Sequence, residues 1–289
     1  VVIRDMENDL LMVQGVAGSG KTSIALHRVA YLMYQGLQTK LSANNIMIIS
    51  PNSIFEQYIS NVLPELGEDN VVSVVFEDIL NTMIKDKKIQ SKNKFLENII
   101  IHSQYKELYK NSIEFKTSKF FLEILDRFLY DIPEQWIEFD DIYYEGTCVV
   151  SKQTLKNKIL GRTETPLGIK LEQLEDYVLE LIFGTGKRRG HKAEKNLVKQ
   201  KIQKFIKIDI VELYKVLFNN ETYFYSLLQN NKPLENIKKI WEYTKENLKT
   251  DCLYYDDAIA ITYLYLKIYG NNEYKNIKQV VIDEAQDYY

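Results

Sequence analysis

Eight residues near the start of the chain, Gly15–Thr22, follow the pattern G-x-x-x-x-G-K-T. Glycines at these positions let the backbone curl so that successive N–H groups point at one anion. A helix that begins directly after the loop aims the positive end of its dipole at the same point. In this pattern Lys21 contacts the β- and γ-phosphates of a nucleotide, and the Thr22 hydroxyl coordinates Mg²⁺. The loop therefore predicts a phosphate-binding site.

A second candidate lies near the other end of the sequence, where the apolar run Val280–Ile282 is followed by Asp283 and Glu284. Ligands bind at the carboxyl ends of the strands in open α/β sheets. Successive strand residues point to opposite sides, so Asp283 can hold Mg²⁺ while Glu284 activates the attacking water. An isolated Asp-Glu pair is more often a solvated turn. The apolar run and the glycine loop in the same chain favour the catalytic interpretation.

The two motifs are much further apart in the sequence than a compact core of this kind needs. We therefore expect one nucleotide site, for ATP and Mg²⁺, formed by distant parts of the chain. In that site Lys21 neutralises charge on the triphosphate, Thr22 and Asp283 hold the metal, and Glu284 is the catalytic base.

The elements that must position these residues alternate between strands and helices. Short apolar runs without period-two alternation predict buried parallel strands at Leu10–Gln14, Ile46–Ser50 and Val280–Asp283, with Val71–Val75 as a fourth candidate. Helices are predicted at Thr22–Gln35, with Gly36 as its C-cap, and at Ile54–Leu63. This rhythm is typical of an α/β fold with a parallel sheet.

The middle of the chain has a different character. Lys, Asn, Glu and Ile dominate it, and apolar residues recur at helical spacing in Phe120–Leu129 and Leu171–Ile182. The α/β pattern returns with an amphipathic helix near Asp256–Tyr269. We therefore expect a P-loop α/β core formed by residues 1–80 and 252–289, interrupted by a mostly helical inserted subdomain, residues 81–251.

Several strings resemble the motifs of UvrD/Rep-like superfamily 1 helicases. Gly18–Thr22 followed by His27–Leu32 is similar to their first motif. Asp283–Asp287, D-E-A-Q-D, is similar to their D-E-x-Q-D motif. Tyr255-Asp256-Asp257 looks like their D-F/Y-x-D-L segment, with Ala258 in place of the usual Leu.

Further strings resemble the HelD-type branch of that family, helicase-like ATPases that act on bacterial RNA polymerase. They are Val13–Gly18, Ser50–Asn52 and Tyr58–Gly67. The resemblance is good over the two ends of the chain and loose over the middle. It departs from the pattern at Ser23, where UvrD relatives often have Arg.

The resemblance implies the RecA-like first motor domain of an ATPase that remodels nucleic acid or complexes of RNA polymerase with nucleic acid. The implied ATP-binding residues are Gly15, Val16, Ala17, Gly18, Ser19, Gly20, Lys21, Thr22, Ser23 and Gln286. Gln286 senses the γ-phosphate in this interpretation. The sequence stops after the second motif and lacks the second RecA-like motor domain with its arginine fingers, so we expect ATP binding with slow or no hydrolysis.

Two alternative functions remain open. One is a processive, ATP-dependent DNA helicase of the UvrD kind, acting on single-stranded or tailed duplex DNA. The other is an interaction module without motor activity, whose nucleotide state controls how the insertion docks on a partner. DNA and bacterial RNA polymerase are therefore the partners to compare.

Nucleic-acid contacts are predicted from the resemblance and from charge. The resemblance implies contacts at Ser50, Pro51, Asn52 and Phe76. The basic stretch Lys187–Lys207 adds Lys187, Arg188 and Arg189 as candidate phosphate contacts, and a helix with Leu197, Val198, Ile202, Phe205 and Ile206 on its buried side. An ordinary solvated lysine-rich surface is the alternative. An acidic stretch, Asp131–Glu145, is interpreted as a solvated loop, with mimicry of nucleic acid as the alternative.

Composition excludes several classes of protein. The net charge of -3 and a pI near 5.8 exclude a strongly basic nucleic-acid coat protein. No apolar run approaches the length of a membrane span, so no membrane association is expected. The two cysteines, Cys148 and Cys252, are too few for a disulfide framework. We expect a cytoplasmic protein.

Overall fold

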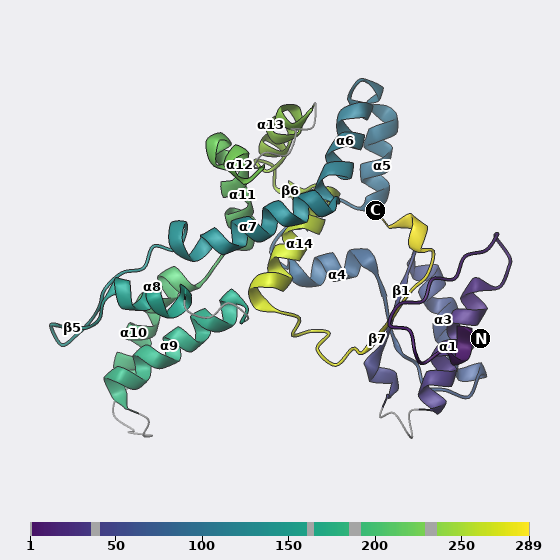
Figure 1. Cartoon of the computed structure of the whole chain (residues 1–289), viewed down its shortest axis with the longest axis horizontal. Helices are drawn as coiled ribbons and strands as arrows, with labels where there is room; N and C mark the ends of the chain where they lie inside the picture. Colours follow the sequence, from purple (N-terminus) through teal and green to yellow (C-terminus); the bar gives the residue numbers. More distant parts are fainter. Residues whose placement is uncertain (1, 36–40, 161–164, 185–191, 229–235, 289) are drawn as a thin grey trace. The chain divides into compact units, whose positions relative to one another are not determined.

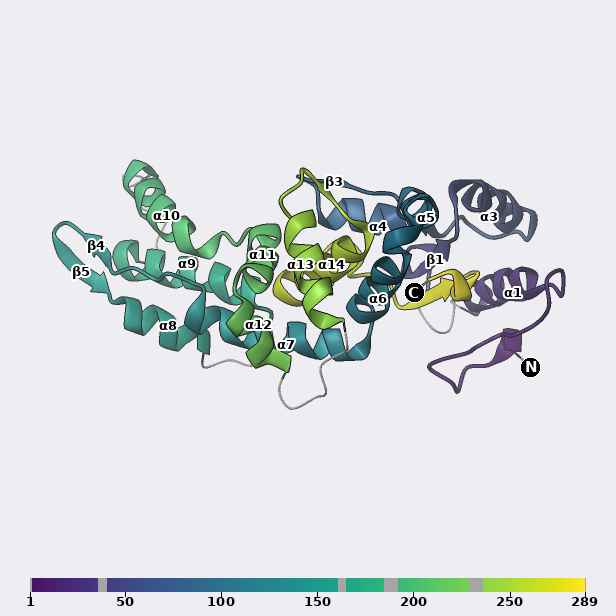
Figure 2. The same cartoon turned by 90° about the horizontal axis from the view of Figure 1, so that it is seen from above.

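The computed structural model describes residues 2–35, 41–160, 165–184, 192–228 and 236–288. The chain forms two compact units (Figures 1 and 2). Unit 1 comprises Val1–Thr82 and Asn272–Tyr289, and unit 2 comprises Met83–Asn271. Unit 2 is therefore inserted in the sequence of unit 1.

A three-stranded parallel sheet forms the centre of unit 1. Its strands are β1 (Ile46–Ser50), β2 (Val72–Val75) and β7 (Gln279–Ile282), in the order β2-β1-β7. Ile48 of β1 is level with Ser73 on one side and with Val281 on the other. Each strand is a short apolar run, as expected for strands that helices cover. The prediction of parallel strands in these three segments is confirmed, but Val280 and Ile282 of β7 are exposed, so this strand is not buried as predicted.

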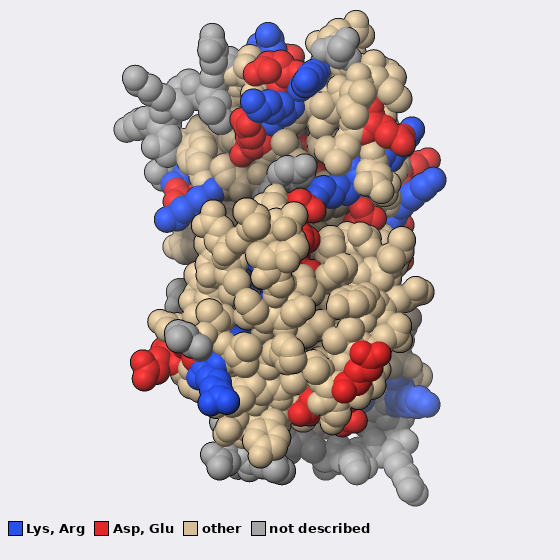
Figure 3. Space-filling view, turned by 90° about the vertical axis from the view of Figure 1, so that its right-hand side faces the viewer, with Lys and Arg blue, Asp and Glu red and all other residues tan. Residues whose placement is uncertain are grey.

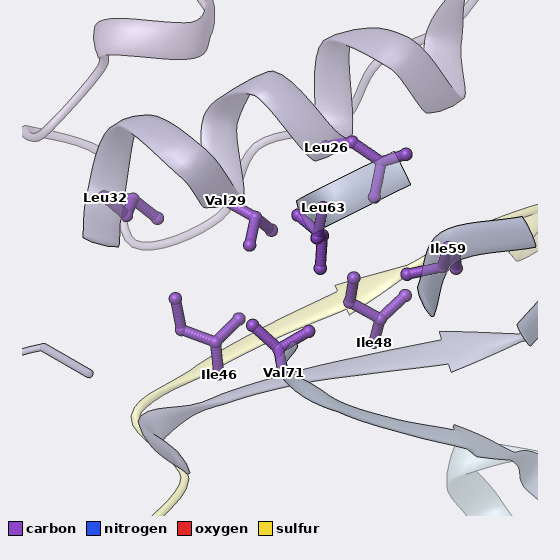
Figure 4. Close-up of a cluster of buried hydrophobic side chains, with 8 residues drawn as sticks. All are labelled: Leu26, Val29, Leu32, Ile46, Ile48, Ile59, Leu63 and Val71. Atoms are coloured by element: carbon purple, nitrogen blue, oxygen red, sulfur yellow. The ribbon is translucent and has the colours of Figure 1, made fainter. Parts of the chain in front are cut away.

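Helices α1 (Lys21–Tyr34) and α3 (Ser53–Glu65) build the core of unit 1 with this sheet. Figure 4 shows apolar side chains of α1 pointing towards those of the strands and α3. They are Leu26, Val29, Leu32, Ile46, Ile48, Ile59, Leu63 and Val71. The core fixes where α1 begins, and therefore the place of the loop before it. Unit 1 also contains most of α4 (Phe76–Met83) and the short turns η1 (Val2–Arg4), η2 (Ala43–Asn45) and η4 (Ala285–Asp287).

The prediction of a buried strand at Leu10–Gln14 is wrong. The segment forms no strand, and Leu10 is 82% and Met12 86% exposed. An apolar run becomes a buried strand only when a neighbour pairs with its backbone. Leu10–Val13 and all four residues of β7 instead line one cavity of about 300 Å³, and β7 is an edge strand of the described sheet.

Unit 2 is built mainly from helices. They are α5 (Lys92–Ile101), α6 (Lys106–Lys116), α7 (Lys119–Gln135), α8 (Lys152–Leu160), α9 (Leu167–Phe183), α10 (Lys192–Ile206), α11 (Ile210–Asn219), α12 (Glu221–Leu228), α13 (Ile237–Asn247) and α14 (Tyr255–Tyr269), with η3 at Ser103–Tyr105. β3 (Lys88–Ile89) pairs in parallel with β6 (Cys252–Leu253), and β4 (Ile142–Tyr144) forms an antiparallel hairpin with β5 (Thr147–Val150).

Helix α14 belongs to unit 2, although residues from 252 onward were expected in the α/β core. The reason is that α14 packs against α6, α7, α9 and α11 of that unit. Its buried residues are Tyr255, Asp256, Asp257, Ala258, Ala260, Ile261, Thr262, Leu264 and Ile268. The described chain is therefore an α/β protein with a small parallel sheet and mostly helices. The chain returns to unit 1 at Asn272 and not at residue 252.

Candidate functional site

The glycine loop occupies the turn between Gln14 and α1. Gly18 and Gly20 adopt φ of 76° and 80°, in the left-handed region that favours glycine. The Ser19 N–H donates to the Val16 carbonyl at 3.1 Å, which closes the turn. Gly20 is the N-cap of α1, so the unpaired N–H groups of the first turn of α1 lie beside the loop. Residues 15–20 and Ser23 are exposed, which leaves the loop open to an anion.

The ammonium group of Lys21 is folded back onto this loop. Its Nζ donates to the carbonyl oxygens of Gly15 at 3.1 Å and Val16 at 3.3 Å. These contacts are exposed and involve neutral acceptors, so they are weaker than contacts with a charged phosphate. Lys21 can therefore exchange these carbonyls for a polyphosphate without breaking an ion pair.

Thr22 and Asp283 meet although 261 residues separate them in the sequence. The Thr22 hydroxyl donates to the Asp283 carboxylate, at 3.1 Å from Oδ1 and 3.2 Å from Oδ2. Asp283 follows β7, and its N–H donates to the Ile49 carbonyl at 3.1 Å, so the sheet itself positions this carboxylate. Burial raises the pKa of Asp283, while the Thr22 hydroxyl and the Lys21 charge act in the opposite direction.

The donor set of this pair fits Mg²⁺. A hydroxyl and one carboxylate are hard oxygen ligands, and Mg²⁺ takes few protein ligands because it keeps waters and substrate phosphates. Within the described part of the chain, no group of three or more His, Cys, Asp and Glu side chains is placed to hold a metal. Thr22 and Asp283 are the residues of this site that could hold Mg²⁺.

Glu284 is held beside Asp283 in an unusual backbone conformation. Its φ of 48° and ψ of 47° lie in the left-handed region, which costs a non-glycine residue of order 1 kcal/mol. The Gln286 amide donates to the Glu284 carboxylate and so fixes where it points. β7 ends at Ile282, so the turn, and not the predicted alternation of strand residues, orients this carboxylate.

Phe76 and Tyr288 form an aromatic contact within unit 1. Their ring centroids lie 5.7 Å apart in an edge-on arrangement, which connects the start of α4 with the segment after η4. Burial, followed by the charges of Asp283 and Asp287, raises the pKa of Tyr288 to about 12. Sequence reasoning missed Tyr288, and its only signal was an aromatic residue directly after the acidic motif.

The other residues of unit 1 that were predicted to contact nucleic acid are buried or cap a helix. Ser50 is fully buried, and its hydroxyl lies 3.4 Å from that of Ser73. The Asn52 side chain accepts a hydrogen bond from the Phe55 N–H at 3.0 Å and caps α3, and Pro51 precedes it half-buried. Only Asn52 of these three is exposed, so a ligand there would have to compete with the cap.

The basic stretch is partly described. Lys187, Arg188 and Arg189 lie outside the described residues. Val198, Ile202 and Phe205 are buried on α10 as predicted, whereas Leu197 is 60% exposed. Lys199 pairs with Glu175 at 2.8 Å, so it is not a free solvated cation.

A cluster of buried charges in unit 2 escaped sequence analysis. Lys116 of α6 pairs with Asp257 at 2.6 Å and with Asp256 at 3.0 Å, and all three side chains are fully buried. The Ser112 hydroxyl donates to Asp256 at 2.8 Å, and the Tyr214 hydroxyl to Asp257 at 2.9 Å. Two carboxylates therefore share one ammonium group in the interior.

Burial and charge change the pKa values of Asp257 and Lys116 in different ways. Burial raises the pKa of Asp257 to about 6, although the Lys116 charge acts to lower it. Burial acts to lower the pKa of Lys116, but the two carboxylates outweigh it and raise that pKa. Asp257 Oδ2 is buried, and no group in the described chain donates to it. The resemblance had drawn attention to Asp256 and Asp257, but nothing in the sequence pointed to Lys116.

Comparisons with known proteins do not assign the chain to a family. No protein-family model matches the chain, and no curated protein matches it significantly. In the described residues we find no helix with both the length and the apolar character needed to cross a membrane.

Proposed function

We propose that the chain is the ATP·Mg²⁺-binding first motor domain of a superfamily 1 helicase-like ATPase of the HelD type, with a RecA-like core. The observation that carries the proposal is the hydrogen bond between Thr22 and Asp283. It joins the two motifs that the nucleotide chemistry requires, beside Lys21 and at the end of a parallel strand.

The roles of the residues follow from their positions. Lys21 and the N–H groups of the loop bind the triphosphate, and bound Mg²⁺ supplies charge neutralisation of the β- and γ-phosphates. Thr22 and Asp283 are the residues that would hold the metal. Glu284, oriented by Gln286, accepts a proton from the attacking water.

Exposed apolar side chains on unit 1 indicate a surface that another domain covers. Leu10, Met12, Val16, Ile54 and Tyr58 are large and exposed. Figure 3 views the side on which α1 and α3 lie in Figure 1, and charged side chains are sparse over its middle. Apolar surface of this kind is typical of an interaction site. A second RecA-like motor domain is the partner that the proposal requires.

Nucleotide binding tests the proposal directly. A fluorescent ATP analogue should bind the chain in Mg²⁺, and Lys21→Ala should abolish most of that binding. Glu284→Gln should bind the analogue as tightly as the parent, because it keeps the phosphate and metal ligands. If the parent chain does not bind the analogue at millimolar concentrations, the proposal is wrong.

The target needs a competition experiment. Core RNA polymerase and a single-stranded-tailed DNA would compete for the labelled chain in ATP·Mg²⁺. Preference for polymerase supports the HelD type, and salt-sensitive preference for DNA supports a UvrD-like helicase. Polymerase binding that survives both Lys21→Ala and Glu284→Gln supports an interaction module without motor activity.

A further inference from the structure

A cleft in unit 2 has the size and chemistry of a binding site. Its cavity of about 690 Å³ lies between the end of α7 with the strand β4 that follows and the α10–α11 turn. This volume is in the range of small-ligand pockets. The apolar part of its lining includes Ile132, Trp136, Ile142, Phe205, Leu213 and Val216.

One wall of this cleft carries unused positive charge. Lys201, Lys204 and Lys207 line it at a spacing of three residues. No hydrogen bond or ion pair engages the ammonium group of any of the three in the part of the chain that the structure describes. By contrast Lys199, two residues before Lys201 on the same helix, is held by Glu175.

Negative charge also lines the cleft, from the segment between α7 and β4 and from the start of α11, and most of it is already used. Asp141 accepts from the Lys152 N–H at 2.7 Å, Asp209 caps α11, and Glu212 pairs with Lys215 at 2.7 Å. Glu138 and Asp140 line the cleft with no cation paired to them among the described residues. Residues of the predicted acidic and basic stretches therefore line the same cavity.

We propose that this cleft binds a polypeptide segment of a protein partner. An apolar side chain of the segment lies on the floor beside Trp136 and Phe205. Acidic side chains of the segment pair with Lys201, Lys204 and Lys207, and a basic side chain pairs with Glu138 or Asp140. The argument for this occupant is complementarity with both signs of charge that line the cleft, and it is independent of nucleotide binding.

A nucleic acid fits the same cleft poorly. Five carboxylates line it, and a phosphate backbone that approached the lysines would meet them at close range. A hollow with an apolar floor suits one inserted side chain better than a continuous backbone. The charged groups are also of both signs, which a peptide can match within a few residues and a polyanion cannot.

The test selects ligands without assuming their sequence. A displayed library of random 12-residue peptides is panned on the intact chain, and recovered peptides are measured by fluorescence anisotropy. We expect peptides with an apolar anchor between acidic and basic residues, and we expect Lys201→Glu with Lys204→Glu to weaken their binding at least tenfold. Lys238→Glu with Lys239→Glu on α13 is the control with equal charge change, and it should alter binding less than twofold.

Two results overturn the proposal. The first is a selection in which no recovered peptide depends on Lys201 and Lys204, although the variant unfolds in urea at the same concentration as the parent. The second is an oligothymidylate of twelve nucleotides that binds with higher affinity than every peptide and loses affinity in the same variant. The second result would assign the cleft to nucleic acid.

Discussion

Replacing Asp257 by Asn should stabilise unit 2 at neutral pH. Asn has the shape of a protonated Asp and carries no charge, so it leaves Lys116 paired with Asp256 alone. The carboxyl of Asp257 has a usual pKa of 3.8 and a pKa of about 6 in the folded chain. Folding therefore favours the protonated form of this one group, and Asn imitates that form at every pH.

The magnitude follows from the shift in pKa. A group whose pKa is raised by folding stabilises the fold below its unfolded pKa and loses that contribution as the pH rises through its folded pKa. A shift of about two units corresponds to about 3 kcal/mol. We expect the stability of Asp257→Asn relative to the parent to rise between pH 4.5 and pH 7.5, by an amount of order 1–3 kcal/mol.

The assay is urea unfolding followed by tryptophan fluorescence. Both tryptophans of the chain, Trp136 and Trp241, lie in unit 2, so their fluorescence during urea unfolding reports on that unit. The exposed Asp176→Asn on α9 is the control, and it should change the free energy of unfolding by less than about 0.5 kcal/mol.

The free energies of unfolding of the parent and of Asp257→Asn are compared at pH 4.5 and pH 7.5. An Asp257→Asn variant that is less stable than the parent at pH 7.5 would refute the reasoning, because the ionised carboxylate would then stabilise the fold. An advantage that does not change with pH would refute the assigned titration.

Three further predictions concern unit 1. Asp283→Asn should weaken nucleotide binding roughly tenfold or more in Mg²⁺ and leave binding in EDTA unchanged, since an amide is a poor Mg²⁺ ligand; equal losses in both buffers would contradict this. Gly20→Ala should weaken nucleotide binding in titrations, because the left-handed conformation costs alanine roughly 1–2 kcal/mol; an unchanged affinity would show that the loop does not need it. Asn52→Ala should destabilise α3 by about 1 kcal/mol in amide hydrogen exchange, while Asn52→Asp keeps the cap; equal protection in both variants would contradict the capping role.

Local patterns were enough to predict most of the core of unit 1. β1 matches its predicted bounds, β2 and β7 are shifted by one residue at most at each end, and α1 begins one residue before its prediction. β1 is buried along most of its length, and each of these segments carries a short apolar run that specifies it locally. Leu10–Gln14 has the same composition but lacks a paired neighbour, and pairing is not a local property.

The candidate site was predictable only in part. The glycine loop and the acidic pair carry their chemistry in adjacent residues, so Thr22 and Asp283 could be assigned to one site before their contact was seen. Lys116 could not be found in this way, because its partners lie 140 or more positions later in the chain. Its isolated position on a lysine-rich helix gave no sign that it is buried.

The two-residue ladder between β3 and β6 has a consequence for the order of folding. About 200 residues separate β2 from β7, and closing so long a loop costs entropy that grows by ~0.6 kcal/mol per doubling of its length. Once the β3–β6 ladder forms, the chain between β2 and β7 behaves as a loop of about 40 residues, which lowers the closure cost by roughly 1.4 kcal/mol. A folded insertion thus lowers the entropic cost of pairing β7 with the rest of the sheet. The carboxylates after β7 reach the glycine loop most readily when unit 2 has folded first.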